Sequence, residues 1–373
     1  MERFCRNITI FAISKFYTNL YNNIIMSELK TTFAGLELKN PFIVSSSSLT
    51  NSAEKNLAWE KAGAGAIVLK SLFEEQILWE CSHIMSEEHP DAGDYLQGYL
   101  RAHYLDEYTK LIKESKQKCS IPIIASINCY TDQEWESFAT MLQEAGADAL
   151  ELNLMAIQTK IHYEYGSFEQ SLINILKHVV AKIQVPVIVK LGSNLTNPIS
   201  LIDQLYANGA KAVVLFNRLY QTDIDIERMS YCSGQILSDA GELAHALRWI
   251  GIGSAAVPNL DFAASGGVSN GSDIVKCLLA GASAVEVCSI LYKDGETKIS
   301  EMLNELREWM NRHQFSDIDS FKGRLKARDL KTPLYLNGLS SSNISEENNN
   351  SSRHLRCCTQ KRSMHVFSVA TSP

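Results

Sequence analysis

The chain has 373 residues, of which 45% are hydrophobic and 21% charged, and its formal net charge is −7. This composition is typical of a globular protein with one large core, and the negative charge argues against a nucleic-acid partner held through its phosphates. The nine cysteines form no CxxC motif and no cluster with histidine. This pattern predicts a reducing compartment, the cytoplasm, and argues against a disulfide framework or a metal site.

The first 25 residues differ from the rest of the chain. The apolar run from Ile8 to Ser14 is followed by Lys15 and is too short for a transmembrane helix. No small-residue cleavage site follows it. We therefore expect residues 1–25 to be an N-terminal extension, with a peripheral membrane anchor as the alternative. The functional domain then starts at residue 26, and a hairpin over Thr31–Lys39 closes the bottom of the fold before the first strand.

Eight short apolar strand patterns follow. Four of them repeat one pattern, in which a helix ends at a glycine, a turn of small residues follows and a buried strand begins. These four lie at Ala62–Lys70, Ala145–Asn153, Asn208–Phe216 and Ala280–Cys288. The other four lie at Pro41–Ser45, Ile121–Asn128, Val185–Lys190 and Leu260–Ser265.

Helical patterns alternate with these strands. The first helix is expected from about Ser52 to Lys61, with Asn51 or Ser52 as its N-cap, and the last covers Thr297–Arg312. A βα unit repeated eight times predicts an α/β fold, the (β/α)8 TIM barrel.

Two connections are longer than one helix requires. They are Ser71–His103 after strand 2 and Asn217–Leu237 after strand 6, and we expect both as insertions on the top face of the barrel. The barrel domain is expected to span residues 26–336. Residues 337–373 are rich in Ser and Asn and too poor in apolar residues to order themselves, which predicts a disordered tail.

Polar residues gather where the strands end, which is where such barrels carry their chemistry. They are Ser45, Ser46, Lys70, Ser126, Asn128, Asn153, Lys190, Asn217, Ser265, Gly266, Gly267, Cys288 and Ser289. A buried lysine requires an anionic partner, and asparagine amides suit planar hydrogen-bonding heterocycles. The plainer alternatives are structural, salt-bridged lysines and turn-forming asparagines.

The Ser265-Gly266-Gly267 run has the composition of a phosphate cup. Glycines let backbone N–H groups approach a phosphate, and the helix expected after Asn270 adds its dipole. Cys288 and Ser289, at the end of strand 8, supply the other half of the cup. A tight turn without a ligand is the alternative.

The chain resembles the dihydroorotate dehydrogenase family, especially its cytosolic branch, from about Thr31 to Gly323. The segments that carry the resemblance are Thr32–Phe42, Leu69–Ser71, Glu151–Leu154, Pro186–Leu191, Ser265–Val268 and Gly281–Ser289. The resemblance implies a barrel that holds FMN, with the phosphate in the cup made by Gly266, Gly267, Cys288 and Ser289. It further implies that Lys190 contacts the flavin ring and that Lys70 lies near flavin and substrate. Finally, it places Ser45, Ser46 and Asn128 against FMN, and Asn153 and Asn217 against the pyrimidine.

The sequence departs from the family at the reacting group. The family carries a Ser-Cys-Pro-Asn or Ser-Ser-Pro-Asn loop whose second residue is the general base, whereas this chain has Met155-Ala156-Ile157-Gln158. Alanine cannot accept a proton. Candidate substitutes are Cys129, Thr159, His162 and Tyr163. The Gly-Leu-Pro-Asn loop that the family carries after strand 2 is also missing.

These observations favour an FMN-dependent oxidoreductase that acts on the CH–CH bond of dihydroorotate or a related dihydropyrimidine. A barrel lyase or aldolase that uses Lys70 or Lys190 as a Schiff-base nucleophile is one alternative. A flavin-binding protein without dehydrogenase activity is the other. The expected partners are a small-molecule substrate and, by resemblance, a second copy of the chain in a homodimer; a membrane partner is not expected.

Overall fold

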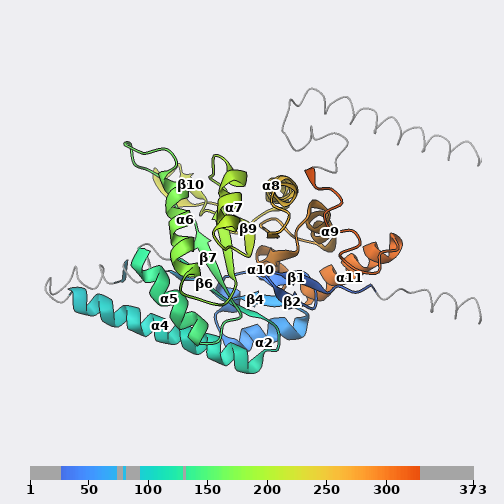
Figure 1. Cartoon of the computed structure of the whole chain (residues 1–373), viewed down its shortest axis with the longest axis horizontal. Coiled ribbons are helices and arrows are strands. Elements are labelled where there is room, and N and C mark those ends of the chain that lie inside the picture. Colours follow the sequence, from blue (N-terminus) through green and yellow to red (C-terminus); the bar gives the residue numbers. More distant parts are fainter. Residues whose placement is uncertain (1–26, 74–78, 81–92, 129–131, 328–373) are drawn as a thin grey trace, which may run out of the picture. The chain divides into compact units, whose positions relative to one another are not determined.

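The computed structural model describes residues 27–73, 79–80, 93–128 and 132–327 (Figure 1). The expected N-terminal extension, the expected tail and Cys129 lie outside the described residues.

Eight parallel strands form a closed barrel. They are β3 (Phe42–Val44), β4 (Ala66–Val68), β6 (Ile123–Asn128), β7 (Ala149–Leu154), β8 (Val187–Gly192), β9 (Ala212–Asn217), β12 (Asp261–Ser265) and β13 (Ala284–Val287). Each strand pairs with its neighbours, and the ring closes where β4 pairs with both β3 and β6. The two-residue strand β5 (Leu72–Phe73) pairs with the end of β6. The predicted (β/α)8 barrel is confirmed.

Helices surround the barrel (Figure 1). They are α2 (Ala53–Ala62), α4 (Gly93–Lys118), α5 (Asp132–Glu144), α6 (Ser167–Val180), α7 (Pro198–Ala207), α8 (Leu243–Ala256), α9 (Gly271–Ala280), α10 (Ser289–Asp294) and α11 (Thr297–Arg312). The Ser52 side chain accepts a hydrogen bond from the Lys55 N–H and caps α2, as predicted, and α11 has the predicted bounds.

The interior of the barrel is filled by small and branched side chains such as Ala149, Ile188 and Ala212, which belong to one buried cluster. The same cluster contains Phe33 and Leu38 from the hairpin of β1 (Thr31–Phe33) and β2 (Leu36–Leu38). This hairpin hydrogen-bonds to the amino-terminal ends of β12 and β13. It therefore closes the bottom of the barrel, as expected, and leaves the carboxyl ends of the strands for the site.

The two long connections contain regular elements. After β9 the chain forms the exposed hairpin of β10 (Thr222–Asp225) and β11 (Ser230–Ser233). After β4 it forms β5 and then the 26-residue helix α4, which begins at Gly93, ten residues before the expected end of the insertion. Two glycines, Gly93 and Gly98, weaken the helical pattern there. Among the described residues, no helix has the length and apolar character needed to cross a bilayer.

Candidate active site

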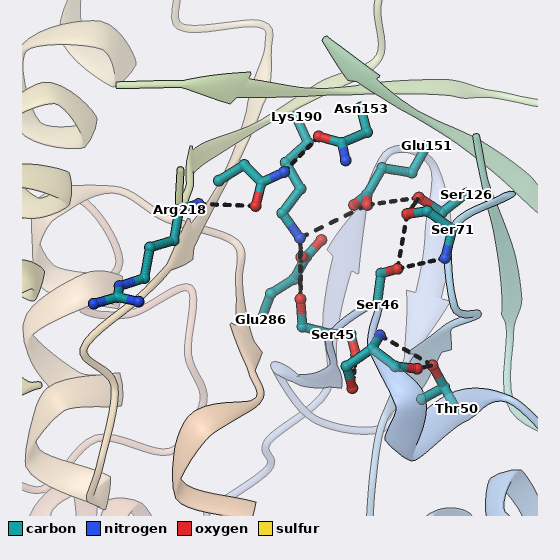
Figure 2. Close-up of polar contacts among 12 residues, drawn as sticks. Ser45, Ser46, Thr50, Ser71, Ser126, Glu151, Asn153, Lys190, Arg218 and Glu286 are labelled. Atoms are coloured by element: carbon teal, nitrogen blue, oxygen red, sulfur yellow. Dashed lines mark hydrogen bonds and ion pairs between the residues drawn. The ribbon is translucent and has the colours of Figure 1, made fainter. Parts of the chain in front are cut away.

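Lys190 lies inside the barrel on β8, where its ammonium group is held by acidic and hydroxyl side chains. Its Nζ lies 2.6 Å from Glu286 Oε2 on β13 and donates a hydrogen bond to Ser45 Oγ at 3.0 Å. Glu151 Oε1 on β7 lies 3.7 Å away (Figure 2). Burial opposes the charged form of Lys190, but the two carboxyl groups outweigh it and raise the pKa of the ammonium above its usual value. Lys190 is therefore a cation at neutral pH.

The pKa values of the two carboxyl groups beside Lys190 are shifted in opposite directions. Burial, followed by the nearby Glu286 charge, raises the pKa of Glu151 well above its usual range. Burial also opposes ionisation of Glu286, but the Lys190 ammonium and hydrogen bonds from Glu151, Lys190 and Ser45 lower the pKa of Glu286. Of the two carboxyl groups, Glu151 therefore retains a proton more readily than Glu286. The candidate residues drawn from the sequence included neither of them.

Serine side chains extend this cluster toward the N-terminal strands (Figure 2). Ser126 Oγ donates to Glu151 Oε1 at 3.2 Å, and Ser71 Oγ lies 2.7 Å from Ser126 Oγ. Ser46 Oγ lies 2.9 Å from Ser71 Oγ and accepts a hydrogen bond from the Ser71 N–H. The hydroxyl groups thus form one continuous chain.

The two strand-end asparagines are joined to each other. Asn217 Nδ2 donates to Asn153 Oδ1 at 2.6 Å, and Asn217 Oδ1 accepts from the Arg218 N–H. The Arg218 guanidinium contacts the Glu242 carboxylate at 3.1 Å. Because Asn153 uses its oxygen in this pair, its amide N–H groups remain as donors for a ligand.

A cavity of about 430 Å³ opens beside these groups at the carboxyl ends of the strands. Its lining includes Ser45, Ser46, Lys190, Asn217, Arg218, Ser238, Ser265, Gly266, Gly267, Glu286, Cys288, Ser289 and Tyr292. Most of the site residues expected from the sequence therefore meet here. Asn153 reaches it through Asn217.

The Gly266–Gly267 turn needs glycine for two different reasons. Both residues have positive φ, +90° and +74°, a region that side chains disfavour. A Cβ on Gly266 would meet no atom within 4 Å, so that backbone faces open space, whereas a Cβ on Gly267 would lie 2.5 Å from the Leu243 nitrogen. The Gly267 N–H donates to Ser238 Oγ at 3.2 Å, and Ser238 in turn donates to Ser289 Oγ at 2.9 Å.

Lys70 does not line this cavity. It is exposed and lines a second cavity of about 560 Å³ between α2 and α4, together with Ser71 and Tyr108. Asn128 ends β6 and is half-buried, and Ala156 lies in an exposed loop, where its carbonyl oxygen accepts from Asn194. Thr159 and His162 are exposed in the same loop, and Tyr163 is half-buried.

A family model described as "Dihydroorotate dehydrogenase" matches residues 28–310 of this chain. The chain belongs to the dihydroorotate dehydrogenase family. The predicted resemblance is confirmed, and with it the expectation of an oxidoreductase acting on CH–CH donors.

Three relatives illustrate the range of this similarity. The dihydroorotate dehydrogenase B (NAD(+)) catalytic subunit of Thermoplasma volcanium is 30% identical over 313 residues, which cover 80% of this chain and 98% of the relative. The protein of the same name from Methanocella arvoryzae is 33% identical over 274 residues, covering 70% and 86%. The NAD-dependent dihydropyrimidine dehydrogenase subunit PreA of Escherichia coli K12 is 24% identical over 317 residues, covering 80% and 77%.

Proposed function

We propose that this member of the dihydroorotate dehydrogenase family is an FMN-dependent oxidoreductase that acts on the CH–CH bond of dihydroorotate or a related dihydropyrimidine. The observation that carries the proposal is the cavity at the carboxyl ends of the strands. A buried cation, a pair of amides and a glycine turn meet at this one cavity. Relatives named for dihydroorotate and for dihydropyrimidine dehydrogenation support both substrate classes.

The residues present fit FMN. A volume of about 430 Å³ lies within the range of cofactor sites, and the backbone at Gly266 faces open space. We assign Gly266, Gly267, Cys288 and Ser289 to the phosphate, and Ser45, Ser46 and Lys190 to the flavin ring. Bound FMN supplies a ring that accepts or gives a hydride.

The chain's own residues bind and orient the reactants. The Lys190 ammonium, paired with Glu286, provides a fixed hydrogen-bond donor at the cavity. The Asn153–Asn217 amide pair provides donors that suit the polar edge of a pyrimidine. Ala156 lies in the loop where the family carries its base, and its side chain can neither accept nor donate a proton. Another group therefore has to exchange the proton that accompanies each hydride.

The Schiff-base alternative fits this geometry less well. A nucleophilic lysine has to be a neutral amine, which requires a depressed pKa. The pKa of Lys190 is raised instead, and Lys70 is exposed in a different cavity.

The visible absorption spectrum of the purified protein, followed by anaerobic additions of dihydroorotate and of 5,6-dihydrouracil, tests the proposal. We expect a flavin spectrum that one of the two compounds bleaches. A stable flavin spectrum with both compounds would favour a flavin-binding protein without this activity. If FMN fails to bind after attempted reconstitution, the proposal is wrong.

The domain boundaries at residues 26 and 336 and the homodimer are proposed along with this function. The relatives named above are called subunits, which makes assembly with another chain the alternative to a homodimer. Sedimentation equilibrium of the purified chain distinguishes a dimer from a monomer that awaits a partner.

A further inference from the structure

The Glu151–Lys190–Glu286 cluster is short of one positive charge if both carboxyl groups are ionised. All three side chains are almost fully buried, so an unbalanced charge is costly. Glu151 Oε2 and Glu286 Oε1 are also buried without a hydrogen-bond partner among the described residues. One proton on Glu151 removes both the excess negative charge and the unpaired oxygens. The protonated Glu151 donates a hydrogen bond to Glu286, and the cluster becomes neutral.

A path of hydroxyl groups leads away from this acid. It runs from Glu151 through Ser126 at 3.2 Å and Ser71 at 2.7 Å to Ser46 at 2.9 Å. All of these distances lie within hydrogen-bond range. Glu151 is not among the residues that line either cavity, but Ser46 lines the main cavity and Ser71 lines the second one.

Tyr108 on α4 fixes the middle of this path. Its hydroxyl donates to the Ser126 carbonyl at 3.0 Å and accepts from the Ser126 N–H at 2.9 Å. Burial raises the pKa of Tyr108, so that hydroxyl stays neutral. These two hydrogen bonds hold the Ser126 backbone on β6, and the Ser126 side chain lies between Glu151 and Ser71.

We propose that Glu151 is a buried carboxylic acid that exchanges its proton with the main cavity through the hydroxyl groups of Ser126, Ser71 and Ser46. Resting on the function proposed above, we infer that this path exchanges the proton for which Ala156 provides no acceptor. Glu151 gives the proton as the carboxylic acid when a pyrimidine ring is reduced, and takes it as the carboxylate when a dihydropyrimidine is oxidised. Glu151 does not touch the cavity and acts through the three serines.

The transfer balances without any electron moving. After the hydroxyl groups rotate and the Glu151 carboxyl group turns its proton from Glu286 toward Ser126, Ser126 accepts that proton and passes its own to Ser71. Ser71 passes its proton to Ser46, which releases one to a ligand or water in the cavity. The three hydroxyls end as they began, Glu151 is left as a carboxylate beside Lys190, and a proton that returns along the same path restores the acid.

The charged and titratable groups around Glu151 come from several elements that surround it. Glu286 lies on β13 and Lys190 on β8, Tyr108 reaches in from α4, and Cys288 follows β13. Burial raises the pKa of Cys288, so it stays a neutral thiol. Lys190 is the one cation in this set, and its charge stabilises the Glu151 carboxylate that remains once the proton has left.

Infrared difference spectroscopy tests the acid directly and needs no activity. Glu151→Gln keeps an acceptor and a donor in place but has no exchangeable acid proton. We expect a protonated carboxyl band in the wild-type protein that is lost in Glu151→Gln. If the band persists in the variant, or is absent from the wild-type protein, Glu151 is not the acid and the proposal is overturned.

The path is tested by transferring the protein to D2O and following the isotope shift of that band. In Ser126→Ala we expect the shift to be slower than in the wild-type protein, because the path is cut. Ser115→Ala is the matched control, since Ser115 is buried and accepts a hydrogen bond from Asn56 away from the path. Equal rates in the two variants would contradict the proposal.

Turnover with the dihydropyrimidine that reduces the flavin completes the test. We expect rates about a hundredfold lower in Glu151→Gln and Ser126→Ala, with FMN retained, and an unchanged rate in Ser115→Ala. The pH dependence of the rate should be lost in Glu151→Gln. Unchanged turnover in that variant would overturn the catalytic part of the proposal. If no compound reduces the flavin while the infrared results hold, the proposed function fails and the proton path stands.

Discussion

The Lys190 ammonium is held by buried carboxyl groups, so its removal leaves a buried charge unpaired. We expect Lys190→Met to lower the free energy of unfolding by about 3–5 kcal/mol, measured by urea denaturation. Lys116→Met is the control, because the Lys116–Asp148 pair is partly exposed, and we expect a loss of about 1 kcal/mol or less there. Similar losses in both variants would mean that the buried Lys190 pair contributes no more to the free energy of unfolding than a partly exposed pair.

Glu151 gives stability a characteristic pH dependence. Its folded-state pKa is raised, so its contribution is complete below the unfolded-state pKa and is lost as the pH rises toward the folded-state value. Glu151→Gln removes that loss. We expect the free energy of unfolding of the variant to gain on the wild-type protein as the pH rises from about 5 to about 8, by up to about 1.4 kcal/mol per pH unit. A pH-independent difference in urea unfolding would contradict this sign.

Ala156 makes a gain of function testable. If the missing base limits dihydroorotate oxidation, Ala156→Cys should accelerate anaerobic flavin reduction by dihydroorotate about a hundredfold. The rate should rise with pH as the thiol ionises. Ala156→Val adds bulk at the same exposed position without a proton acceptor and should leave the rate unchanged. Stopped-flow absorbance measures all three proteins.

At the residue scale the sequence predicted Lys190 and its serine partner but not the two glutamates. Glu151 and Glu286 each lie in a strand pattern dominated by apolar residues, and such a pattern predicts only a buried strand. The available signal was a carboxylate in the middle of a buried strand, which requires a partner. Which partner it finds depends on the register between strands, and one sequence does not reveal that register.

At the scale of elements, the glycine turn after β12 is sensitive to substitution. Gly267→Ala adds strain at positive φ and a clash with Leu243, so we expect a measurable loss of thermal stability and of FMN binding. Gly35→Ala is the control, because it has φ +81° and open space around its Cβ. Strain alone costs about 1–2 kcal/mol there and should leave FMN binding intact. Equal FMN affinity in the two variants would rule out the glycine turn as the phosphate site.

The elements show why two strand-end lysines, which look alike in the sequence, lie in different places. Lys190 lies within β8, where the alternation of side chains directs it into the barrel. Lys70 follows β4 by two residues and lies beyond that alternation, in the second cavity. The strands, the bottom hairpin and the ends of α2 and α11 were predictable from local pattern and capping. The β10–β11 hairpin was not, because its strands are exposed and lack a buried face.

At the scale of the whole molecule, a bound cofactor stabilises the fold through linkage. With free FMN at about 100 times its dissociation constant, we expect the free energy of unfolding to increase by about 2.7 kcal/mol. Thermal denaturation at several FMN concentrations measures this effect. Riboflavin, which lacks the phosphate, should stabilise the protein less if the Gly266–Gly267 cup is used. Equal stabilisation by the two compounds would argue against that cup.

The closure of the barrel also has a mechanical consequence. β4 joins β3 and β6 through two residue pairs on each side, whereas β7 and β8 pair over five. Sub-global opening should therefore begin at β4 and its two neighbours, and amide protons there should be the least protected of the barrel. Ser45 and Ser46 follow β3, next to the weakly paired strand β4. Glu151 and Lys190 lie on β7 and β8, which pair over five residues. A ligand that contacts residues on both sides of the cavity would stabilise the pairing of β4. Slower amide exchange in β3 and β4 would therefore report that the cavity is occupied.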